Sequence, residues 1–552
     1  AFNENFLLYL AMTRASDSLT LSYASSGEDG PGLEPSLVVK RLESLGYVDK
    51  PIDIPLSIEP DTEAEYVWRP LQSLSLLSER WGALFSGHEV NPLWWGLYNW
   101  ARESEAYRPR LAEVSRGIRD NNDVPVITQD LVNGLFLSKG YMSGSVTRLE
   151  RYQQCPFKFY AQYGLKLEPR PVRSFGAPEI GTFLHANLER LGNYLLENNK
   201  QWRDLDEEEQ ENLCHAVADE ILQENQLGEE TSDAYQKAIE QRVQRTLHVT
   251  VDRLVEWSKR SDFDTKYLEQ DFGRQGGWNP IRVPLGEDRY LRLIGQIDRI
   301  DEYTRDDQTY GMVIDYKSGG AHVTAQDVYY GLKLQLMTYL LALESAYGKT
   351  HGGSMSPAAV VYSYVKNPKI PADAPISYEE AVSLANESDA WQNSGYFSDD
   401  IELLTHIDNK FLSYGSKRGP YVPIATKKDQ TISSRDLRKV KSTGEFDVMC
   451  RYTNHVMAET GRNIGDGQFP IKPYQLNGLR PCTYCDYRTV CRFDSSRNRY
   501  NYLSRLSEDD ALERMKEVLS DGNNSNDRNN RNEKNNSNEG NNSSEGGENH
   551  GC

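Results

Sequence analysis

The feature that most constrains the fold is a pair of strand-like segments that carry acidic residues within apolar patterns. The first, YLRLIGQIDRIDEY, spans residues 290–303, and the second, YGMVIDYKSGG, spans residues 310–320. The intervening TRDDQ predicts a turn, so the two segments should form a hairpin. Because residues two apart on a strand project from the same face, Asp315 and Lys317 should face the same way, close to Asp298 on the neighbouring strand.

Two carboxylates and an ammonium group at one strand end indicate a specific chemistry. Asp298 and Asp315 can hold a hard divalent cation, which lowers the pKa of a bound water. Lys317 can stabilise the attacking hydroxide or the charge that develops on a phosphate. An Asp-x-Lys triplet alone also fits a solvated strand end with a salt bridge, so the interpretation needs support from neighbouring segments.

Two predicted helices flank the hairpin and supply that support. EIGTFLHANLERLGNYL, residues 179–195, predicts an amphipathic helix with His185 in its first turns. This histidine is either structural or a further metal ligand. AQDVYYGLKLQLMTYLLALESAY, residues 325–347, predicts an apolar helix that places Gln335 and Tyr339 on one face.

The order of the elements predicts the fold class. PAAVVYSYVK, residues 357–366, is typical of a third, buried strand that follows the second helix. Helix, strand, strand, helix and strand in this order build a small mixed sheet with a site at one edge. We therefore expect an α/β fold, with a mixed sheet flanked by helices, over residues 143–515.

Cysteines near the end of this segment form a second pattern. PCTYCDYRTVC carries Cys482, Cys485 and Cys491, three of the seven cysteines in the chain. A thiolate site for zinc or an iron–sulfur cluster normally takes four protein ligands, so a fourth is expected elsewhere. Spacing alone does not distinguish the two metals. Cys214 and Cys450 are interpreted as ordinary buried thiols.

Several of these segments together resemble a known family. In order, GTFLH, GQIDRID, VIDYKSG and LQLMTYL resemble the PD-(D/E)xK, restriction-endonuclease-like nuclease domain of the RecB type. The opening FLLYLAMTRASDSLTLSY resembles the last motif of superfamily 1 helicases. SVTRLERYQQCPFKFYAQYGLKL, residues 145–167, is similar to the segment that opens the nuclease domain in the AddB family of bacterial AddAB helicase–nucleases.

The resemblance to AddB implies the missing cysteine ligand. Residues 145–167 contain Cys155, and a C-x2-C-x5-C group follows more than 300 residues later, as in that family. The resemblance therefore implies a [4Fe–4S] cluster that clips the two ends of the nuclease domain together. Its implied ligands are Cys155, Cys482, Cys485 and Cys491. A clip of this kind would remove the entropy of closing a very long loop.

The same resemblance implies roles for the site residues. The implied catalytic set is Asp298, Asp315, Lys317, Gln335 and Tyr339. Asp298, Asp315 and His185 become Mg2+ ligands, Lys317 becomes the catalytic lysine, and Gln335 and Tyr339 contact DNA or the scissile phosphate. The implied reaction is exonucleolytic hydrolysis of the 5′-ended strand, as single-stranded DNA leaves a helicase during double-strand break repair. The implied partner is an AddA-type helicase–nuclease in a heterodimer.

Four regions are expected along the chain. Residues 1–24 should end a helicase domain, with LLYLAMTRA helical and SLTLSYA a strand. Residues 25–142 should form a linker and a helical region, and residues 143–515 the nuclease domain with its clip. The Asn-rich residues 516–552 cannot bury enough apolar surface to fold.

Arg14 matches the family arginine that reaches toward a nucleotide γ-phosphate. The sequence has no G-x4-GK-[ST] phosphate loop for ATP. We therefore expect the C-terminal part of a larger polypeptide, which on its own should be a nuclease without ATPase activity.

Composition limits the compartment and the partners. Seven unevenly placed cysteines favour a reducing cytoplasm over secretion. No apolar run approaches the roughly 18 residues of a membrane span, so no membrane partner is expected. The net charge of −20 argues against indiscriminate nucleic-acid binding but allows a local basic track.

Two other classes of protein share parts of the pattern. A stand-alone iron–sulfur exonuclease, of the kind associated with CRISPR systems, has the same core and cysteine layout. The helicase motif and the helical region argue against it. A non-catalytic scaffold would use the nuclease fold only to guide DNA and brace a partner. The presence of Asp298, Asp315 and Lys317 together argues against that, since decayed nuclease domains tend to lose one of them.

Overall fold

The computed structural model describes most of the chain in two compact units, residues 1–120 and residues 121–552. The described residues are 2–25, 32–49, 51–52, 60–85, 87, 89–119, 122–138, 140–168, 177–224, 233–286, 288–350, 355–365, 375–377, 380, 384, 391–495 and 497–521. None of the described helices combines the length and the apolar character that crossing a membrane requires.

The first unit is helical. Its elements are α1 (Phe2–Met12), α2 (Leu37–Ser44), η1 (Pro60–Tyr66), α3 (Pro70–Phe85), α4 (Leu93–Glu103) and α5 (Arg108–Arg119). Helices α3, α4 and α5 contact one another around a small apolar core. Trp94 is fully buried in this core, and its indole N–H donates to Glu63 Oε2 at 2.9 Å. The tryptophan-rich stretch of α4 therefore contributes to packing.

The strand expected over residues 18–24 does not form. After α1 the chain is irregular, and none of the described strands pairs with this segment. An alternating pattern makes a strand only where a partner accepts its backbone hydrogen bonds, and that partner is missing among the described residues.

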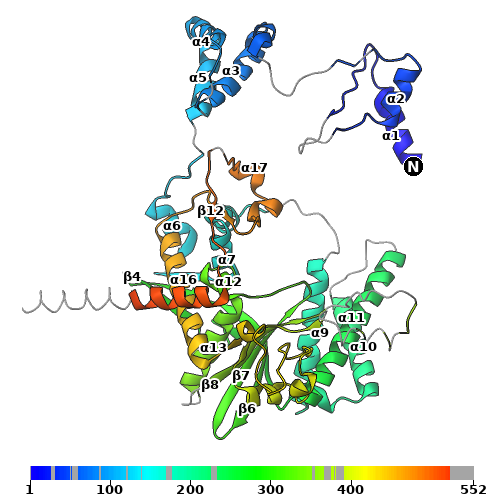
Figure 1. The fold of residues 1–552 in the computed structure, drawn as a ribbon, viewed down its shortest axis with the longest axis vertical. Helices are drawn as coiled ribbons and strands as arrows, with labels where there is room; N and C mark the ends of the chain where they lie inside the picture. Colours follow the sequence, from blue (N-terminus) through cyan, green and yellow to red (C-terminus); the bar gives the residue numbers. More distant parts are fainter. Residues whose placement is uncertain are drawn as a thin grey trace, which may run out of the picture. The chain divides into compact units, whose positions relative to one another are not determined.

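A six-stranded mixed sheet forms the centre of the second unit (Figure 1). In spatial order its strands are β10 (Val440–Lys441), β9 (Ser394–Ser398), β8 (Met355–Tyr364), β7 (Gln308–Lys317), β6 (Gly295–Arg305) and β3 (Asp264–Phe272). Strands β3, β6 and β7 pair antiparallel, whereas β7 and β8 are parallel. The predicted hairpin and the predicted third strand are therefore present and adjacent.

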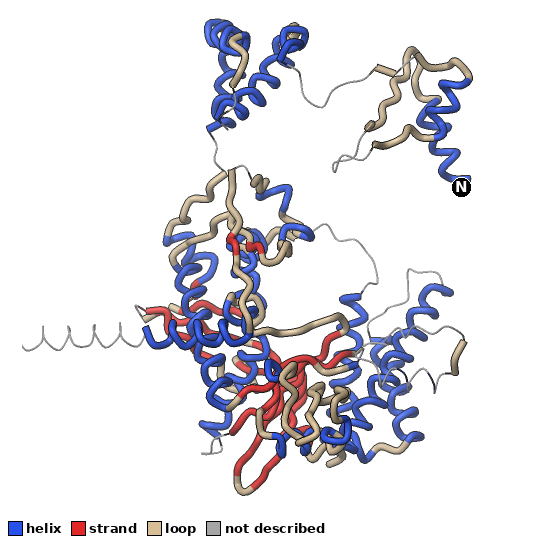
Figure 2. The backbone as a smooth tube through the Cα atoms, in the orientation of Figure 1, coloured by secondary structure: helices blue, strands red, loops and turns tan. Residues whose placement is uncertain are grey.

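Helices cover both faces of this sheet (Figure 2). Along β7, Val313 belongs to one hydrophobic core while Met312 and Ile314 belong to the other, as strand alternation requires. The first core contains α7 (Val146–Gln154), α12 (Ala325–Tyr329), α13 (Gln335–Thr350) and α16 (Thr443–Gly465). The second contains α9 (Ala177–Glu197), α10 (Glu207–Glu224), α11 (Asp233–Arg260) and α15 (Ile401–Ile407). The expected α/β class is confirmed.

A smaller four-stranded sheet explains why the predicted strand over residues 290–303 is two strands. Its spatial order is β1 (Leu137–Ser138), β2 (Tyr141–Gly144), β5 (Arg289–Leu293) and β4 (Ile281–Gly286). Strand β5 pairs with β2, and the Ile294 N–H donates to the Gly144 carbonyl at 3.0 Å before β6 joins the large sheet. Helix α6 (Gln129–Phe136) and β1 belong to the second unit, which begins before the predicted start at residue 143. The four predicted regions stay a prediction.

The helix predicted over residues 325–347 is interrupted. Helix α12 ends at Tyr329 and α13 begins at Gln335. Between them Gly331 adopts φ +69°, a conformation that suits glycine and turns the chain. The interruption makes Gln335 the first residue of a new helix.

The remaining elements of the second unit are short, apart from a C-terminal helix. They are α8 (Pro156–Phe159), η2 (Tyr160–Gly164), η3 (Trp202–Asp204), η5 (Phe411–Tyr414), η6 (Leu437–Lys439), β11 (Tyr474–Gln475), η7 (Pro481–Tyr484), α17 (Arg488–Cys491) and β12 (Asn501–Tyr502). Residues 508–521 are helical, and Ala511, Leu512 and Met515 are buried in the core. This helix extends past the predicted limit at residue 515, and the rest of the Asn-rich segment lies outside the described residues.

Candidate active site and cysteine site

The acidic residues of the central hairpin meet where β6 begins and β7 ends. The antiparallel register of the two strands, continued by one residue, places Asp298 opposite Asp315. Asp298 Oδ2 accepts the backbone N–H of Tyr316 at 2.7 Å. Lys317 Nζ lies 2.5 Å from Asp315 Oδ2. The structure thus brings together the two aspartates and the lysine that the sequence pattern singled out.

The second aspartate of IDRID, Asp301, faces away from this cluster. Asp301 accepts two hydrogen bonds from the Arg299 guanidinium, each 2.7 Å long, and both side chains are buried. On a strand, residues 299 and 301 share the face opposite to residue 298. Asp301 therefore contributes to the buried core, whereas Asp298 borders an open cleft.

His185 and Glu269 form with Asp298 a group that could hold a metal ion. One ligand atom from each residue lies within 4.8 Å of the other two. His185 Nδ1 is 3.4 Å from Asp298 Oδ2 and 3.9 Å from Glu269 Oε1. His185 Nε2 lies 3.0 Å from the Tyr316 carbonyl oxygen, which can only accept, so Nε2 carries the proton. Nδ1 faces the two carboxylates, so it can carry a second proton shared with them or, in the neutral ring, offer its lone pair to a metal ion.

Nothing in the sequence pattern singles out Glu269. It lies in β3, between Leu268, which pairs with Arg299, and Gln270, which pairs with Ile297. Its position beside Asp298 comes from this strand pairing. Its backbone adopts φ +44°, which is uncommon for a residue with a side chain and is often found at functional sites.

Burial and like charge shift the pKa values of these groups. Burial raises the pKa of Asp298; the charge of His185 opposes this shift, and the charge of Glu269 adds to it. Burial also raises the pKa of Asp315, and the charge of Asp298 adds to that shift. For His185, burial lowers the pKa, but the nearby carboxylates of Glu269 and Asp298 outweigh burial and raise it. A divalent cation would relieve the repulsion among the carboxylates, so this set of donors fits Mg2+.

Gln335 links the members of the cluster. Its Nε2 donates to Asp315 Oδ1 and to the Tyr339 hydroxyl, both at 2.8 Å, and its Oε1 accepts from Lys317 Nζ at 3.3 Å. Gln335 and Tyr339 lie four residues apart on α13 and face the same side, as predicted. Their implied contact with DNA stays a prediction.

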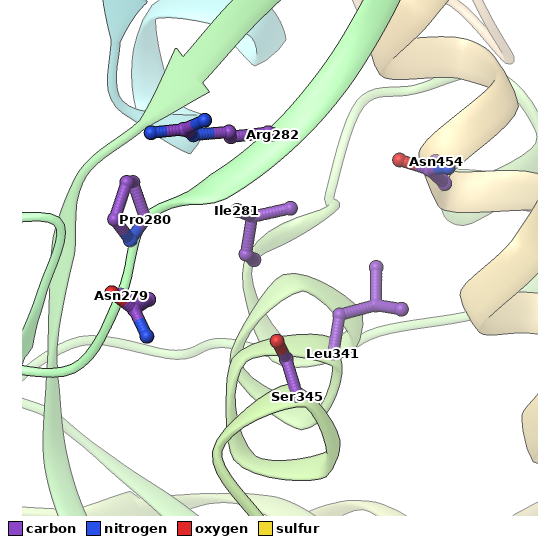
Figure 3. Close-up of a pocket in the computed structure, with 7 residues that line it drawn as sticks. All are labelled: Asn279, Pro280, Ile281, Arg282, Leu341, Ser345 and Asn454. Carbon is purple, nitrogen blue, oxygen red and sulfur yellow. The ribbon is translucent and has the colours of Figure 1, made fainter. Parts of the chain in front are cut away.

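Several side chains of the cluster border an open cleft of about 580 Å3. Its lining includes His185, Glu269, Asp298, Lys317 and Tyr339. A second hollow, of about 600 Å3, lies between β4, α13 and α16 (Figure 3). It is lined by Asn279, Pro280, Ile281, Arg282, Leu341, Ser345 and Asn454. This lining contains no carboxylate, histidine or cysteine, so it offers none of the usual side-chain ligands of a metal ion.

The four cysteines with a predicted shared role line one small cavity. They are Cys155, Cys482, Cys485 and Cys491, and all four are free thiols. Cys155 lies between α7 and α8, Cys482 lies in η7, and Cys491 ends α17. The structure therefore brings together two segments more than 300 residues apart in the sequence.

The environment of Cys155 suits a thiolate ligand. Burial raises the pKa of this thiol to about 11, while hydrogen bonds from the backbone amides of Lys158, Lys472 and Phe157 lower it. Amides directed at a sulfur stabilise its thiolate, and hydrogen bonds of this kind tune iron–sulfur clusters. A bound metal would supply the charge that burial otherwise disfavours.

Two of the other cysteines and Arg14 lie elsewhere. Cys214 and Cys450 are buried in the two hydrophobic cores, which confirms their interpretation as ordinary buried thiols. Arg14 follows α1 in the first unit and is exposed, and its implied nucleotide contact stays a prediction.

Comparison with known proteins identifies the class that this fold and site define. A family model described as the PD-(D/E)XK nuclease superfamily matches residues 143–492, and the chain belongs to this superfamily. A model described as the fifth domain of the ATP-dependent helicase/deoxyribonuclease AddB matches residues 59–117. This second match lies within residues 25–142, for which the sequence patterns predicted only a linker and a helical region.

The individual proteins that are similar to this chain carry one common name. Each is named as the B subunit of an ATP-dependent helicase/deoxyribonuclease. The protein from Desulforudis audaxviator (strain MP104C) is 31% identical over 511 residues, which cover 92% of this chain and 43% of that protein. Those from Thermoanaerobacter sp. (strain X514) and Clostridioides difficile (strain 630) are 30% and 29% identical, and each match covers 94% of this chain and 45% of the relative. The predicted resemblance to AddB is confirmed, and the chain spans less than half the length of these relatives.

Proposed function

We propose that this chain is the nuclease part of an AddB-type protein and that it hydrolyses phosphodiester bonds in DNA with Mg2+. The observation that carries the proposal is the convergence of Asp298, Lys317, His185 and Glu269 at one open cleft, with the buried Asp315 carboxylate paired to Lys317. Membership of the PD-(D/E)XK nuclease superfamily supports it.

The residues of the site divide the work of hydrolysis. His185, Glu269 and Asp298, with Asp315 beside them, would hold the Mg2+ ion. The ion, when bound, supplies Lewis-acid stabilisation and an acidified water. Lys317 presents its ammonium group at the cleft, where it offsets negative charge on a phosphate. Gln335 holds the Asp315 carboxylate and the Lys317 ammonium in place.

The DNA strand and the partner are further parts of the proposal. The relatives are named as parts of an ATP-dependent helicase/deoxyribonuclease, which supports DNA as the substrate. We take the substrate to be the 5′-ended single strand that emerges from a duplex end, and the partner to be an AddA-type helicase–nuclease. The match of residues 59–117 to an AddB domain favours this assignment over a stand-alone exonuclease.

The proposed second cofactor is a [4Fe–4S] cluster held by the four cysteines. All four cysteines line one cavity, and their spacing along the chain resembles the AddB pattern, which supports a cluster at this place.

A cleavage assay tests the proposed function. The purified chain is incubated with labelled single-stranded DNA in Mg2+ or in EDTA, and products are resolved by length. Asp315→Ala should abolish Mg2+-dependent cleavage, because a lost ligand removes several kcal/mol of charge stabilisation. Asp306→Asn, in the exposed turn at the other end of the hairpin, is the matched control and should cleave normally. Full activity of Asp315→Ala would refute this site, and DNA binding without cleavage by the wild type would favour a scaffold.

A further inference from the structure

The amino end of α13 is held by a carboxylate from another segment. Glu150 lies on α7, and its Oε1 accepts the backbone N–H groups of Leu334 at 2.7 Å and Gln335 at 3.2 Å. The first amides of a helix have no acceptor within the helix, and a carboxylate there also interacts favourably with the helix dipole. Glu150 therefore fixes where α13 starts.

The residue fixed in this way organises the nuclease site. Gln335 is the first residue of α13, and its side-chain amide bonds to Asp315, Lys317 and Tyr339. A shift of the first turn of α13 would move this amide relative to β7, which carries Asp315 and Lys317. The position of Gln335 thus depends on a residue outside the cleft lining.

The electrostatic environment agrees with a role near the site. Burial raises the pKa of Glu150 to about 7, while the amides of Leu334 and Gln335 and the charges of Lys317 and Lys333 lower it. A partly buried carboxylate is costly unless it is well bonded. Its two bonds go to the residues that start α13, so the local structure depends on keeping this contact.

We propose that Glu150 is a positioning residue of the nuclease site. It holds the amino end of α13 so that the Gln335 amide keeps Asp315 and Lys317 in their working arrangement. This inference rests on the proposed function, since it concerns the same site. Glu150 also lies near the cysteine site in the sequence, because α7, which carries it, ends at Gln154 and is followed directly by Cys155.

A purely structural role is the alternative, and the chain offers a matched control for it. Glu508 accepts the N–H of Ala325, the first residue of α12, at 3.1 and 3.3 Å through its two carboxylate oxygens. It therefore holds the start of another helix in the same core. Glu508→Ala removes a comparable helix contact without touching Gln335.

The experiment compares Glu150→Ala, Glu150→Gln, Gln335→Ala, the double variant Glu150→Ala/Gln335→Ala, and Glu508→Ala. Glu150→Ala should lower kcat on the order of 10- to 100-fold with little change in KM for DNA, as is typical when support for a ligand is lost. Glu150→Gln should restore most activity, since its side-chain oxygen still accepts the two N–H groups. The double variant should be no slower than Gln335→Ala, because both changes act through the same amide. Glu508→Ala should lower the Tm and leave kcat unchanged.

Calorimetric titration with Mg2+ provides a readout that does not require cleavage. The affinity for Mg2+ should fall in Glu150→Ala and in Gln335→Ala alike, because both loosen the Asp315 carboxylate. An unchanged Mg2+ affinity in Glu150→Ala, or rate losses that multiply in the double variant, would overturn the positioning role. A wild-type chain that binds Mg2+ but cleaves no DNA would refute the proposed function, and the titration would still decide the role of Glu150.

Discussion

His185 Nε2 donates to the carbonyl oxygen of Tyr316 at 3.0 Å, and this contact joins α9 to β7. Tyr316 lies between Asp315 and Lys317, so the histidine is oriented by the same strand that carries the proposed catalytic pair. The Tyr316 backbone N–H in turn donates to Asp298. The backbone N–H and carbonyl groups of Tyr316 therefore position an aspartate and the histidine of the proposed metal site.

His185→Ala should weaken Mg2+ binding on the order of tenfold or more, because it removes one of the proposed ligands. It also removes the charge that offsets the repulsion between the Glu269 and Asp298 carboxylates. Isothermal titration with Mg2+ measures the change. His406→Ala is the matched control, since His406 also contacts a carboxylate, Asp262, at 2.6 Å but lies outside the cleft lining. Equal Mg2+ affinity in His185→Ala and the wild type would remove the histidine from the ligand set.

Glu269 allows a test of ligand function against backbone strain. Glu269→Ala and Glu269→Gly should both lose Mg2+ affinity, because both remove the carboxylate. At φ +44° alanine keeps a strained conformation that glycine adopts freely. The glycine variant should therefore be more stable than the alanine variant, by about 1 kcal/mol.

Thermal or urea unfolding of the two Glu269 variants measures this difference in stability. If the alanine variant were the more stable one, strain at this residue would be ruled out. If either variant kept full Mg2+ affinity, Glu269 would not be a ligand.

Local patterns were sufficient to predict one side of the site. The alternation of β6 and β7 places Asp298, Asp315 and Lys317, and the helical spacing of α13 places Gln335 and Tyr339. These relations extend over a few residues within one element or one hairpin. They follow from the geometry of a strand or helix once its type is known.

The remaining contacts of the site depend on how elements distant in the sequence pack against one another. Glu269 reaches Asp298 because β3 joins the sheet next to β6, and Glu150 reaches Gln335 because α7 packs beside the start of α13. Neither contact has a local sequence pattern. The break at Gly331 is likewise invisible to an apolar helical pattern, since leucines and tyrosines continue across it. The strand predicted over residues 18–24 does not form for the opposite reason, because a local pattern was present but no described strand pairs with it.

Glu344, on α13, should make stability depend on pH. Burial raises its pKa to about 7, and the charge of Asp447 adds to the shift. The folded state then binds more protons than the unfolded state between the usual pKa of 4.5 and about 7. The stabilising contribution of this group is present below pH 4.5 and is lost as the pH rises through about 7.

Glu344→Gln, which cannot ionise, should therefore raise the Tm at pH 8 and change it little at pH 5. Melting curves at the two pH values give the comparison. Glu513→Gln, at an exposed position of the C-terminal helix, is the control and should show no such difference. A Glu344→Gln variant that is equally stabilised at both pH values would contradict the raised pKa of Glu344.

The cysteine site gives the last prediction. If the four cysteines hold one cluster, Cys155→Ser and Cys491→Ser should show the same defect, although the two residues lie at opposite ends of the domain. Even when they are purified without oxygen, both variants should lack iron and the brown colour. Both substitutions should also lower the Tm of the nuclease domain. The reason is that a cluster lacking one thiolate is labile, and its loss frees a closed loop of more than 300 residues.

Cys214→Ala and Cys450→Ala are the matched controls for the cluster, since both residues are buried thiols outside the cavity. They should retain iron and colour even where they lower the Tm through lost packing. Metal analysis and an absorption spectrum separate the outcomes. Stoichiometric zinc without visible absorption would leave the clip in place but refute the iron–sulfur assignment. A brown, iron-loaded Cys155→Ser protein would refute the four-cysteine site itself, because the three remaining cysteines would then hold the cluster without the segment that carries Glu150.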